Sequence, residues 1–321
     1  MHARLLDFAD EADRAAWNAL DAVSPLSTPF SSLGYLDACM AHTSGTRVGV
    51  VVEDRGQPVA ATTLFVRRVG GLPVALLPPL TFYAPILLAA LPSDATTHGR
   101  TTPLDALLEA VEARVRVALW PLPPALVDTR TLRWRGWSVS PLYTYRLALD
   151  EMPDDRRSWS AGARRLWTSS RDRFTVEQAP EAIPALATML RARYAEQGKR
   201  LAPNDANLTA FVSRLANDGK AQVWVARNRA GAVEGGLVLL THGTTAHYWL
   251  ASSLPGPAMT VLVGEALARL RDEGFATFDF GGANTPSIAE FKRKFGSTLV
   301  PYARAVWTRP RALRLHPALR S

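Results

Sequence analysis

Apolar residues in the second half of the chain recur at two alternating spacings. Between Met259 and Gly274 they follow the 3.6-residue period of a helix, in one stripe that ends at the glycine. Short runs on either side follow the two-residue period of strands. The pattern predicts strands at 174–178, 221–227, 233–240, 245–252, 277–280 and 299–307, and further helices at 181–197 and 207–218.

The first half repeats this order of elements with little residue identity. Asp10, and Ser31 or Ser32, are typical N-caps of two helices, and Pro103 is typical of the first turn of a third. The alternation of helices and strands favours an α/β sheet over a sandwich, and a repeat of this length indicates duplicated domains. Strands are expected at 47–53, 58–67, 72–77, 125–130 and 143–149.

A polar, proline-marked segment at 150–155 separates the two halves. We therefore expect a first domain at 1–150, a second at 156–308 and a basic tail at 309–321. In the first domain, prolines make the loop at 78–85 stiff and exposed. Its Tyr83 has two open interpretations: it lines a groove for a substrate, or it belongs to a rigid surface turn, which is the commoner role of such loops.

Composition indicates a globular protein with a sizeable core. Of the 321 residues, 47% are hydrophobic and 21% are charged. No apolar run approaches the ~20 residues of a membrane span, and acidic residues interrupt the first dozen positions where a signal peptide would need an apolar core. The single cysteine, Cys39, cannot form an internal disulfide and lies in a helical apolar pattern. A cytoplasmic location is therefore expected.

The net charge of +8 suits a polyanionic partner or a phosphate-bearing substrate, although an arginine-rich proteome would give the same value. Three basic clusters lie in the second half. They are Arg156, Arg157, Arg164, Arg165, Arg171 and Arg173; Lys292, Arg293 and Lys294; and Arg304, Arg309, Arg311, Arg314 and Arg320.

The sequence lacks the motifs of several common classes of enzyme and binding site. The chain has no Gly-x-Gly-x-x-Gly, no Walker loop, no Gly-x-Ser-x-Gly elbow and no cysteine pair. Among the six histidines only His242 and His247, on adjacent strands of a hairpin, have a spacing that a metal could use, and a surface hairpin is the better interpretation. No metal and no resident cofactor are expected.

Phe-Asp-Phe-Gly-Gly at 278–282 and Phe-Lys-Arg-Lys-Phe-Gly at 291–296 form the candidate site. The first is a buried strand that points Asp279 away from its phenylalanines. A capping box at 287–290 predicts a helix that starts at Ser287, buries Ile288 and places Lys292 at its rim. A carboxylate, a glycine pair and a lysine would then meet at the carboxyl end of a strand, where α/β proteins bind ligands. The alternative is ordinary core with a solvated Lys-Arg-Lys face.

These two motifs, after a helix that ends in Asp-Glu-Gly-Phe at 272–275, resemble the end of the catalytic domain in FemAB-type transferases. That family comprises the peptidoglycan-bridge aminoacyltransferases and relatives with a BioF2-like acetyltransferase domain, within the GNAT superfamily. The resemblance extends upstream to about Trp159, where an arginine-rich helix opens the domain. It implies two tandem GNAT-like domains of mixed sheets flanked by helices, with the second catalytic and the first non-catalytic or acceptor-binding.

The resemblance implies transfer of an acyl or aminoacyl group to an amine of a cell-wall, polysaccharide, nucleotide-sugar-linked or small-metabolite acceptor. Lys292 would counter phosphate or oxyanion charge, with Asp279 as the second catalytic residue and Phe291 against the donor. The other expected substrate contacts are Gly281, Gly282, Arg164, Arg165, Arg293, Tyr83 and Tyr248.

The resemblance implies aminoacyl-tRNA as the donor, because the better-known FemAB relatives take the acyl group from it. GNAT enzymes typically bind the CoA pyrophosphate on a glycine-rich loop at the start of the central helix, where free N–H groups face the anion. Here that loop, 252–259, contains Pro255 and Pro257, which have no N–H. One feature argues against tRNA. The bridge-forming enzymes often carry a long helical arm for tRNA in the catalytic domain, and this sequence has only short helices between 181 and 218. Two alternatives stay open: an acyl-CoA-dependent N-acetyltransferase, and a non-catalytic protein that binds tRNA or a nucleotide sugar. The oligomeric state is open.

Overall fold

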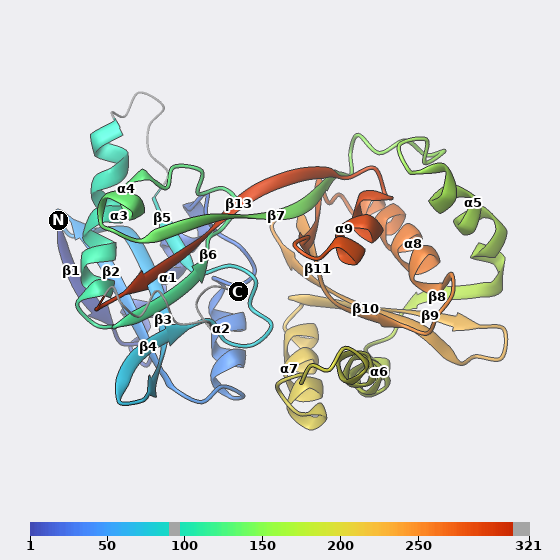
Figure 1. The fold of residues 1–321 in the computed structure, drawn as a ribbon, viewed down its shortest axis with the longest axis horizontal. Helices are drawn as coiled ribbons and strands as arrows, with labels where there is room; N and C mark the ends of the chain where they lie inside the picture. Colours follow the sequence, from blue (N-terminus) through green and yellow to red (C-terminus); the bar gives the residue numbers. More distant parts are fainter. Residues whose placement is uncertain (90–96, 311–321) are drawn as a thin grey trace. The chain divides into compact units, whose positions relative to one another are not determined.

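Figure 1 shows the computed structural model, which describes residues 1–89 and 97–310. The chain divides into two compact units: unit 1 comprises Met1–Leu142 and Pro301–Ser321, and unit 2 comprises Tyr143–Val300. The divisions fall inside two strands, β7 (Ser138–Ala148) and β13 (Thr298–Thr308). Both units combine a sheet with flanking helices, as the sequence predicts.

Unit 1 is built on a mixed sheet. Its strands follow the order β1-β2-β3-β4-β6-β13, and β5 pairs with β3. Neighbours are antiparallel except β4 and β6, which are parallel. The further elements of this unit are β1 (His2–Leu6), α1 (Glu11–Val23), α2 (Leu33–Met40), β2 (Thr46–Asp54), β3 (Gln57–Val69), β4 (Leu72–Leu76), β5 (Ile86–Leu88), α3 (Thr97–Glu112), β6 (Val117–Pro121) and α4 (Arg130–Trp134).

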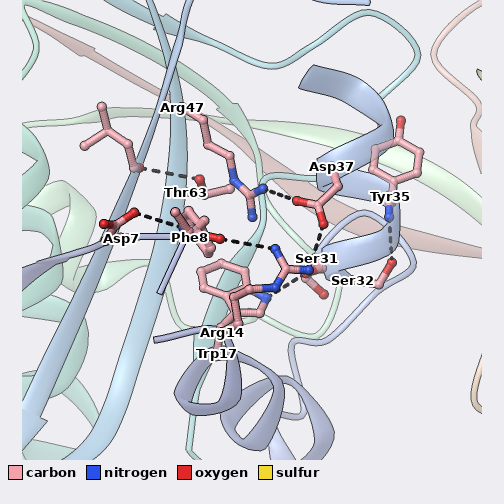
Figure 2. Close-up of polar contacts among 12 residues, drawn as sticks. Asp7, Phe8, Arg14, Trp17, Ser31, Ser32, Tyr35, Asp37, Arg47 and Thr63 are labelled. Atoms are coloured by element: carbon pink, nitrogen blue, oxygen red, sulfur yellow. Dashed lines mark hydrogen bonds and ion pairs between the residues drawn. The ribbon is translucent and has the colours of Figure 1, made fainter. Parts of the chain in front are cut away.

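One carboxylate joins two helices of unit 1 to its sheet (Figure 2). Asp37 on α2 accepts a hydrogen bond from Arg14 on α1 at 2.9 Å and another from Arg47 on β2 at 2.6 Å. The Arg47 guanidinium also lies 3.5 Å from the centre of the Phe8 ring. Because the Arg47 side chain is only 7% exposed, the ion pair and the ring are what make its burial tolerable.

Unit 2 has its sheet in the order β7-β12-β11-β10-β9-β8. Strands β11 and β12 are parallel, and the other neighbours are antiparallel. The elements of this unit are α5 (Ala161–Ser170), η1 (Arg171–Arg173), β8 (Phe174–Gln178), η2 (Pro180–Ala182), α6 (Ile183–Glu196), α7 (Asp205–Asn217), β9 (Ala221–Asn228), β10 (Val233–His242), β11 (Thr245–Ser253), α8 (Ala258–Asp272), β12 (Thr277–Gly282) and α9 (Pro286–Arg293).

The sheet of unit 2 lies between two helical layers (Figure 1). The central helix α8 covers one face, and its apolar stripe packs into a core that includes Phe278, Phe280 and Phe295. Helices α6 and α7 cover the other face, where Phe211 of α7 meets Trp249 of β11 edge to face with ring centres 5.4 Å apart. The sheet is therefore buried on both faces, which explains why its strands read as apolar runs.

Helix α5 packs on α8 at a glycine. A Cβ atom added to Gly264 would lie 2.8 Å from the indole rings of both Trp159 and Trp167, closer than side chains approach one another. Both tryptophans are buried. The arginine-rich segment is thus fixed to the central helix by two indole rings that pack closely against Gly264.

Four details differ from the sequence-based expectation. Helix α3 begins at Thr97, so Pro103 lies inside it and not in its first turn. The last strand, expected to complete the second half, pairs with β6 of unit 1. Residues 125–130 form a turn instead of a strand, because the N–H groups of Leu126 and Val127 bond to carbonyls within the same loop. The short strands β1, β5 and β6 were not predicted, since runs of three to five residues carry too little periodicity. Of the expected basic tail, residues 311–321 lie outside the described residues.

Candidate active site

The parallel pair β11 and β12 is joined over only part of its length. Residues 245–247 pair with 277–279, and the pairing stops there although β11 continues to Ser253 and β12 to Gly282. Each strand is also irregular just beyond this point. The pairing of β10 with β11 skips Trp249, and the pairing of β12 with β7 shifts between Asp279 and Gly282. These irregularities free backbone groups where the two strands separate.

Asp279 holds the irregular end of β12 in place. Its Oδ1 accepts the Gly281 N–H at 2.8 Å and lies 2.7 Å from the Thr144 hydroxyl, which is also 2.9 Å from the Gly281 carbonyl. Its Oδ2 accepts a hydrogen bond from Arg146 Nε at 3.0 Å. Gly281 has a φ of 68°, the left-handed region that glycine adopts without strain.

The Asp279 carboxylate is fully buried and charged. Burial by itself raises its pKa, but positive charge from His247 and Arg146 and hydrogen bonds from Thr144 and Gly281 outweigh it, so the pKa lies below its ordinary value. His247 Nδ1 lies 4.0 Å from Oδ2, and burial lowers the pKa of His247 to about 4. At neutral pH, where His247 is neutral, it is Arg146 and the hydrogen bonds that lower the pKa of Asp279.

Lys292 binds the carbonyls that the irregular strand end leaves free. Its Nζ donates to Gly282 O at 2.7 Å and to Gly281 O at 3.2 Å, and lies 5.5 Å from the centre of the Tyr248 ring. The residue is 6% exposed. Burial lowers the pKa of Lys292 to about 8, against the opposing charge of Asp279. The ammonium therefore persists at neutral pH, with two of its three N–H groups engaged by the glycines.

The Tyr248 ring lies near the ammonium, and Tyr248 and Phe291 pack against the same apolar core. Tyr248 on β11 donates its hydroxyl to Met259 Sδ at 3.7 Å, and burial raises the pKa of this phenol, so it is neutral at pH 7. Phe291 is half-buried and meets Phe295 edge to face with ring centres 5.2 Å apart. The cation is thus largely removed from water, and electrostatic interactions are stronger there than in water.

The helix that carries Lys292 differs from the expected one. It begins at Pro286 after Thr285, which makes no side-chain cap, so the predicted capping box at Ser287 is wrong. Ile288 is 43% exposed and Lys292 is buried, the reverse of the expectation. The reason is the pair of glycine carbonyls, which need donors that a lysine supplies and an isoleucine does not.

The structure brings together six of the residues that the sequence singled out. They are Asp279, Gly281, Gly282, Tyr248, Phe291 and Lys292. Two of the three arginines make their described contacts elsewhere: Arg164 Nη1 donates to Arg157 O at 3.3 Å, and Arg293 pairs with Glu290. Arg165 is exposed on α5. Tyr83 belongs to unit 1 and is fully buried against Phe30 and Tyr302, so it neither lines an open groove nor lies in an exposed surface turn.

Three residues of this cluster were missed from the sequence. Thr144 and Arg146 lie on β7, which the sequence analysis assigned to the first half. They are two residues apart, so they share one face of the strand and both reach Asp279. His247 was interpreted as part of a surface hairpin, but it is 3% exposed beside Asp279. Polar residues alternating within an apolar strand were the available signal.

Within residues 1–89 and 97–310, no three histidine, cysteine or acidic side chains gather as metal ligands would. In the same part of the chain, no helix is both long and apolar enough to cross a membrane.

The site lies in a segment that matches a known family. Residues 154–293, which include α5 to α9, match the family described as acetyltransferase (GNAT) domain. Unit 2 carries a GNAT-type acyltransferase domain. No curated protein sequence matches the chain.

Solved structures share the fold of this chain over nearly its whole length. The crystal structure of FemX matches with a TM-score of 0.73 and 13% identity, over 98% of this chain and 99% of that one. The structure of L-PGS from Bacillus licheniformis matches with a TM-score of 0.61 and 14% identity, over 97% and 95%. A tandem GNAT protein from the clavulanic acid biosynthesis pathway matches with a TM-score of 0.56 and 17% identity, over 95% and 97%. At these identities the likeness shows the fold, which fits the FemAB-like family and the predicted tandem GNAT architecture.

Proposed function

We propose that the protein is an N-acyltransferase that moves an aminoacyl group from aminoacyl-tRNA to the amine of a small-molecule or nucleotide-sugar-linked acceptor. The observation that carries this proposal is the buried Lys292 ammonium, which two hydrogen bonds to Gly281 O and Gly282 O hold in place. In the proposed reaction its third N–H faces the acyl oxygen. Acyl transfer develops negative charge on the acyl oxygen, and a preorganised cation in a dry site stabilises that charge.

The reaction needs no covalent enzyme intermediate. The acceptor nitrogen forms a bond to the carbonyl carbon, the ester bond to the ribose breaks, and the proton that the amine loses ends on the departing ribose hydroxyl. Lys292 stabilises the oxyanion between these steps. Phe291 and Tyr248 exclude water, which would otherwise hydrolyse the ester. Asp279 touches no substrate in this scheme; it positions the glycine carbonyls that hold Lys292.

The loop before α8 supports aminoacyl-tRNA over acyl-CoA. In residues 254–257, Pro255 and Pro257 have no N–H, and the Leu254 N–H donates to Glu234 O at 2.9 Å. Helix α8 then begins after Pro257 without a side-chain cap. A pyrophosphate placed there would find few of the donors that a glycine-rich loop offers. The structural neighbours also include FemX and L-PGS.

The second candidate is acyl-CoA-dependent N-acetylation, which the description of the matching family as an acetyltransferase favours. The test compares label transfer from tRNA charged with radiolabelled amino acids and from radiolabelled acetyl-CoA, into a set of primary amines that includes nucleotide-linked peptides. We expect transfer from charged tRNA, lost in Lys292→Met. Transfer from acetyl-CoA alone would replace the first candidate by the second.

A further inference from the structure

An open hollow lies at one end of the sheet of unit 2, away from Lys292. Its volume is about 480 Å³, and it is lined by Arg173, Phe174, Asn228, Arg229, Ala230 and Glu234. This volume falls in the range of ligand sites, which is roughly 300–1,000 Å³. Two segments form it: the turn that leads into β8 and the turn between β9 and β10.

Two arginine residues line this hollow. Arg173 and Arg229 are exposed, and in the part of the chain that the structure describes neither forms an ion pair. Arginine presents a planar fork of N–H groups that matches a phosphate with two parallel hydrogen bonds. A pair of arginines on opposite turns therefore suits a phosphate group held between them.

A fixed carboxylate lies in the same hollow. Asn228 Nδ2 donates to Glu234 Oε1 at 2.7 Å, while Asn228 Oδ1 accepts the N–H groups of Ala230 and Ala232 at 3.0 and 3.1 Å. The turn thus orients the amide, and the amide orients Glu234. The second carboxylate oxygen is an acceptor for a hydroxyl group, as an acidic residue is for a ribose in dinucleotide sites. A site for inorganic phosphate alone would not place a carboxylate there.

The hollow opens at the same edge of the sheet as the candidate active site. Strands β11 and β12 run parallel and end at this edge, β9 also ends here, and β8 and β10 begin here. The Leu254 N–H donates to Glu234 O, so the hollow adjoins the loop before α8. From β11 to β8 there are three strand spacings, roughly 15 Å at about 4.8 Å each.

We propose that this hollow binds one ribonucleotide of the acyl donor, with its phosphate between Arg173 and Arg229 and a ribose hydroxyl on Glu234. The half-buried Phe174 adds an apolar ring edge against which a base can pack. This subsite rests on the proposed function in that the nucleotide is assigned to the donor. Its chemistry is shared by the 3′ end of tRNA and by the nucleotide of CoA, and the experiment separates the two sources.

The experiment measures binding of a fluorescent single-stranded RNA of eight nucleotides ending in CCA, of DNA with the same sequence, and of CoA as a competitor. The double variant Arg173→Ala/Arg229→Ala is compared with Arg193→Ala/Arg214→Ala, which removes the same charge from exposed positions on α6 and α7. We expect the first variant to weaken RNA binding at least tenfold and to flatten its salt dependence by a slope of roughly 1, because phosphate contacts are lost. The second should change little.

Glu234→Gln tests the hydroxyl contact. It should reduce the preference for RNA over DNA severalfold and leave DNA binding unchanged, since DNA lacks the 2′-hydroxyl. Equal RNA affinity in the two arginine double variants would overturn the subsite. The proposed function would still stand in that case if transfer from charged tRNA depends on Lys292. If Arg173→Ala/Arg229→Ala weakens CoA binding and leaves RNA binding unchanged, the subsite stands and the donor is acyl-CoA. If wild type binds neither RNA nor CoA, both ideas fail.

Discussion

The Nζ atom of Lys292 donates a hydrogen bond of 2.7 Å to the carbonyl oxygen of Gly282, at the end of β12. This bond joins the two motifs of the candidate site and gives the lysine two functions. It satisfies a buried carbonyl, and it holds an ammonium in a fixed place beneath an aromatic ring. Stability and activity should therefore both respond when this lysine is changed, and they can be told apart.

Lys292→Met removes two hydrogen bonds and leaves the Gly281 and Gly282 carbonyls without their buried donor. We expect the free energy of unfolding to fall by about 1–3 kcal/mol. Activity measured well below the melting temperature should fall ~100-fold or more, the usual result of losing one preorganised electrostatic contact. Lys294→Met, two residues away and outside the glycine contacts, is the control and should alter neither by much. Equal small losses in both variants would show that Lys292 has no special role.

The pH dependence separates the two functions of Lys292. Its pKa in the folded protein is about 8, below its ordinary value, so between these two values the unfolded chain binds more protons than the folded one. Stability contributed by this group therefore rises with pH over that interval. Activity that needs the ammonium should instead fall as pH rises through about 8, tenfold per unit above it. A pH–rate profile together with melting curves at the same pH values tests this. Activity that stays flat up to pH 10 would contradict a charged Lys292 in the reaction.

Thr144→Val tests the positioning of the glycine pair. The Thr144 hydroxyl lies between Asp279 Oδ1 and Gly281 O, and valine keeps the shape while removing the polar atom. We expect a loss of about 1–2 kcal/mol in stability, and a lower kcat with little change in KM because the Lys292 cation shifts. Thr144→Ser restores the hydroxyl and should recover most of kcat. A merely structural role would give the stability loss without the kcat loss.

How far the sequence predicts this site can be judged from the same residues. The apolar stripe of α8 and the strand at 277–280 followed from periodicity, because both are dictated by residues close together in the chain. The contact between Thr144 and Asp279 joins residues 135 positions apart, and no local pattern contains it. The burial of Lys292 depends on the shifted register of β12, which frees two carbonyls, and register irregularities leave little trace in the sequence. The motifs therefore named the residues of the candidate site, while the contacts among them required the fold.

Gly264→Ala tests the attachment of α5 to the central helix. A methyl group there would lie 2.8 Å from the Trp159 and Trp167 rings, so one or both indoles must move, at a cost of about 1–3 kcal/mol. The matched control is Gly162→Ala in α5, where nothing lies within 4 Å of the new atom. That change should stabilise the helix by up to about 1 kcal/mol, because alanine is the better helix former. Denaturant unfolding of both variants gives the comparison. Identical effects would mean that the indoles do not pack as described.

Hydrogen exchange in the loop before α8 distinguishes the two donor classes without an acceptor. If CoA were the donor, its pyrophosphate would bind at residues 253–260 and slow exchange of the backbone N–H groups there. We expect saturating CoA to leave these amides unchanged, because Pro255 and Pro257 have no N–H and Leu254 already donates to Glu234. Pro255→Ala/Pro257→Gly adds two donors and serves as the positive comparison, in which protection by CoA should increase. Strong protection in the wild-type protein would transfer the assignment to acyl-CoA, whatever the role of Lys292.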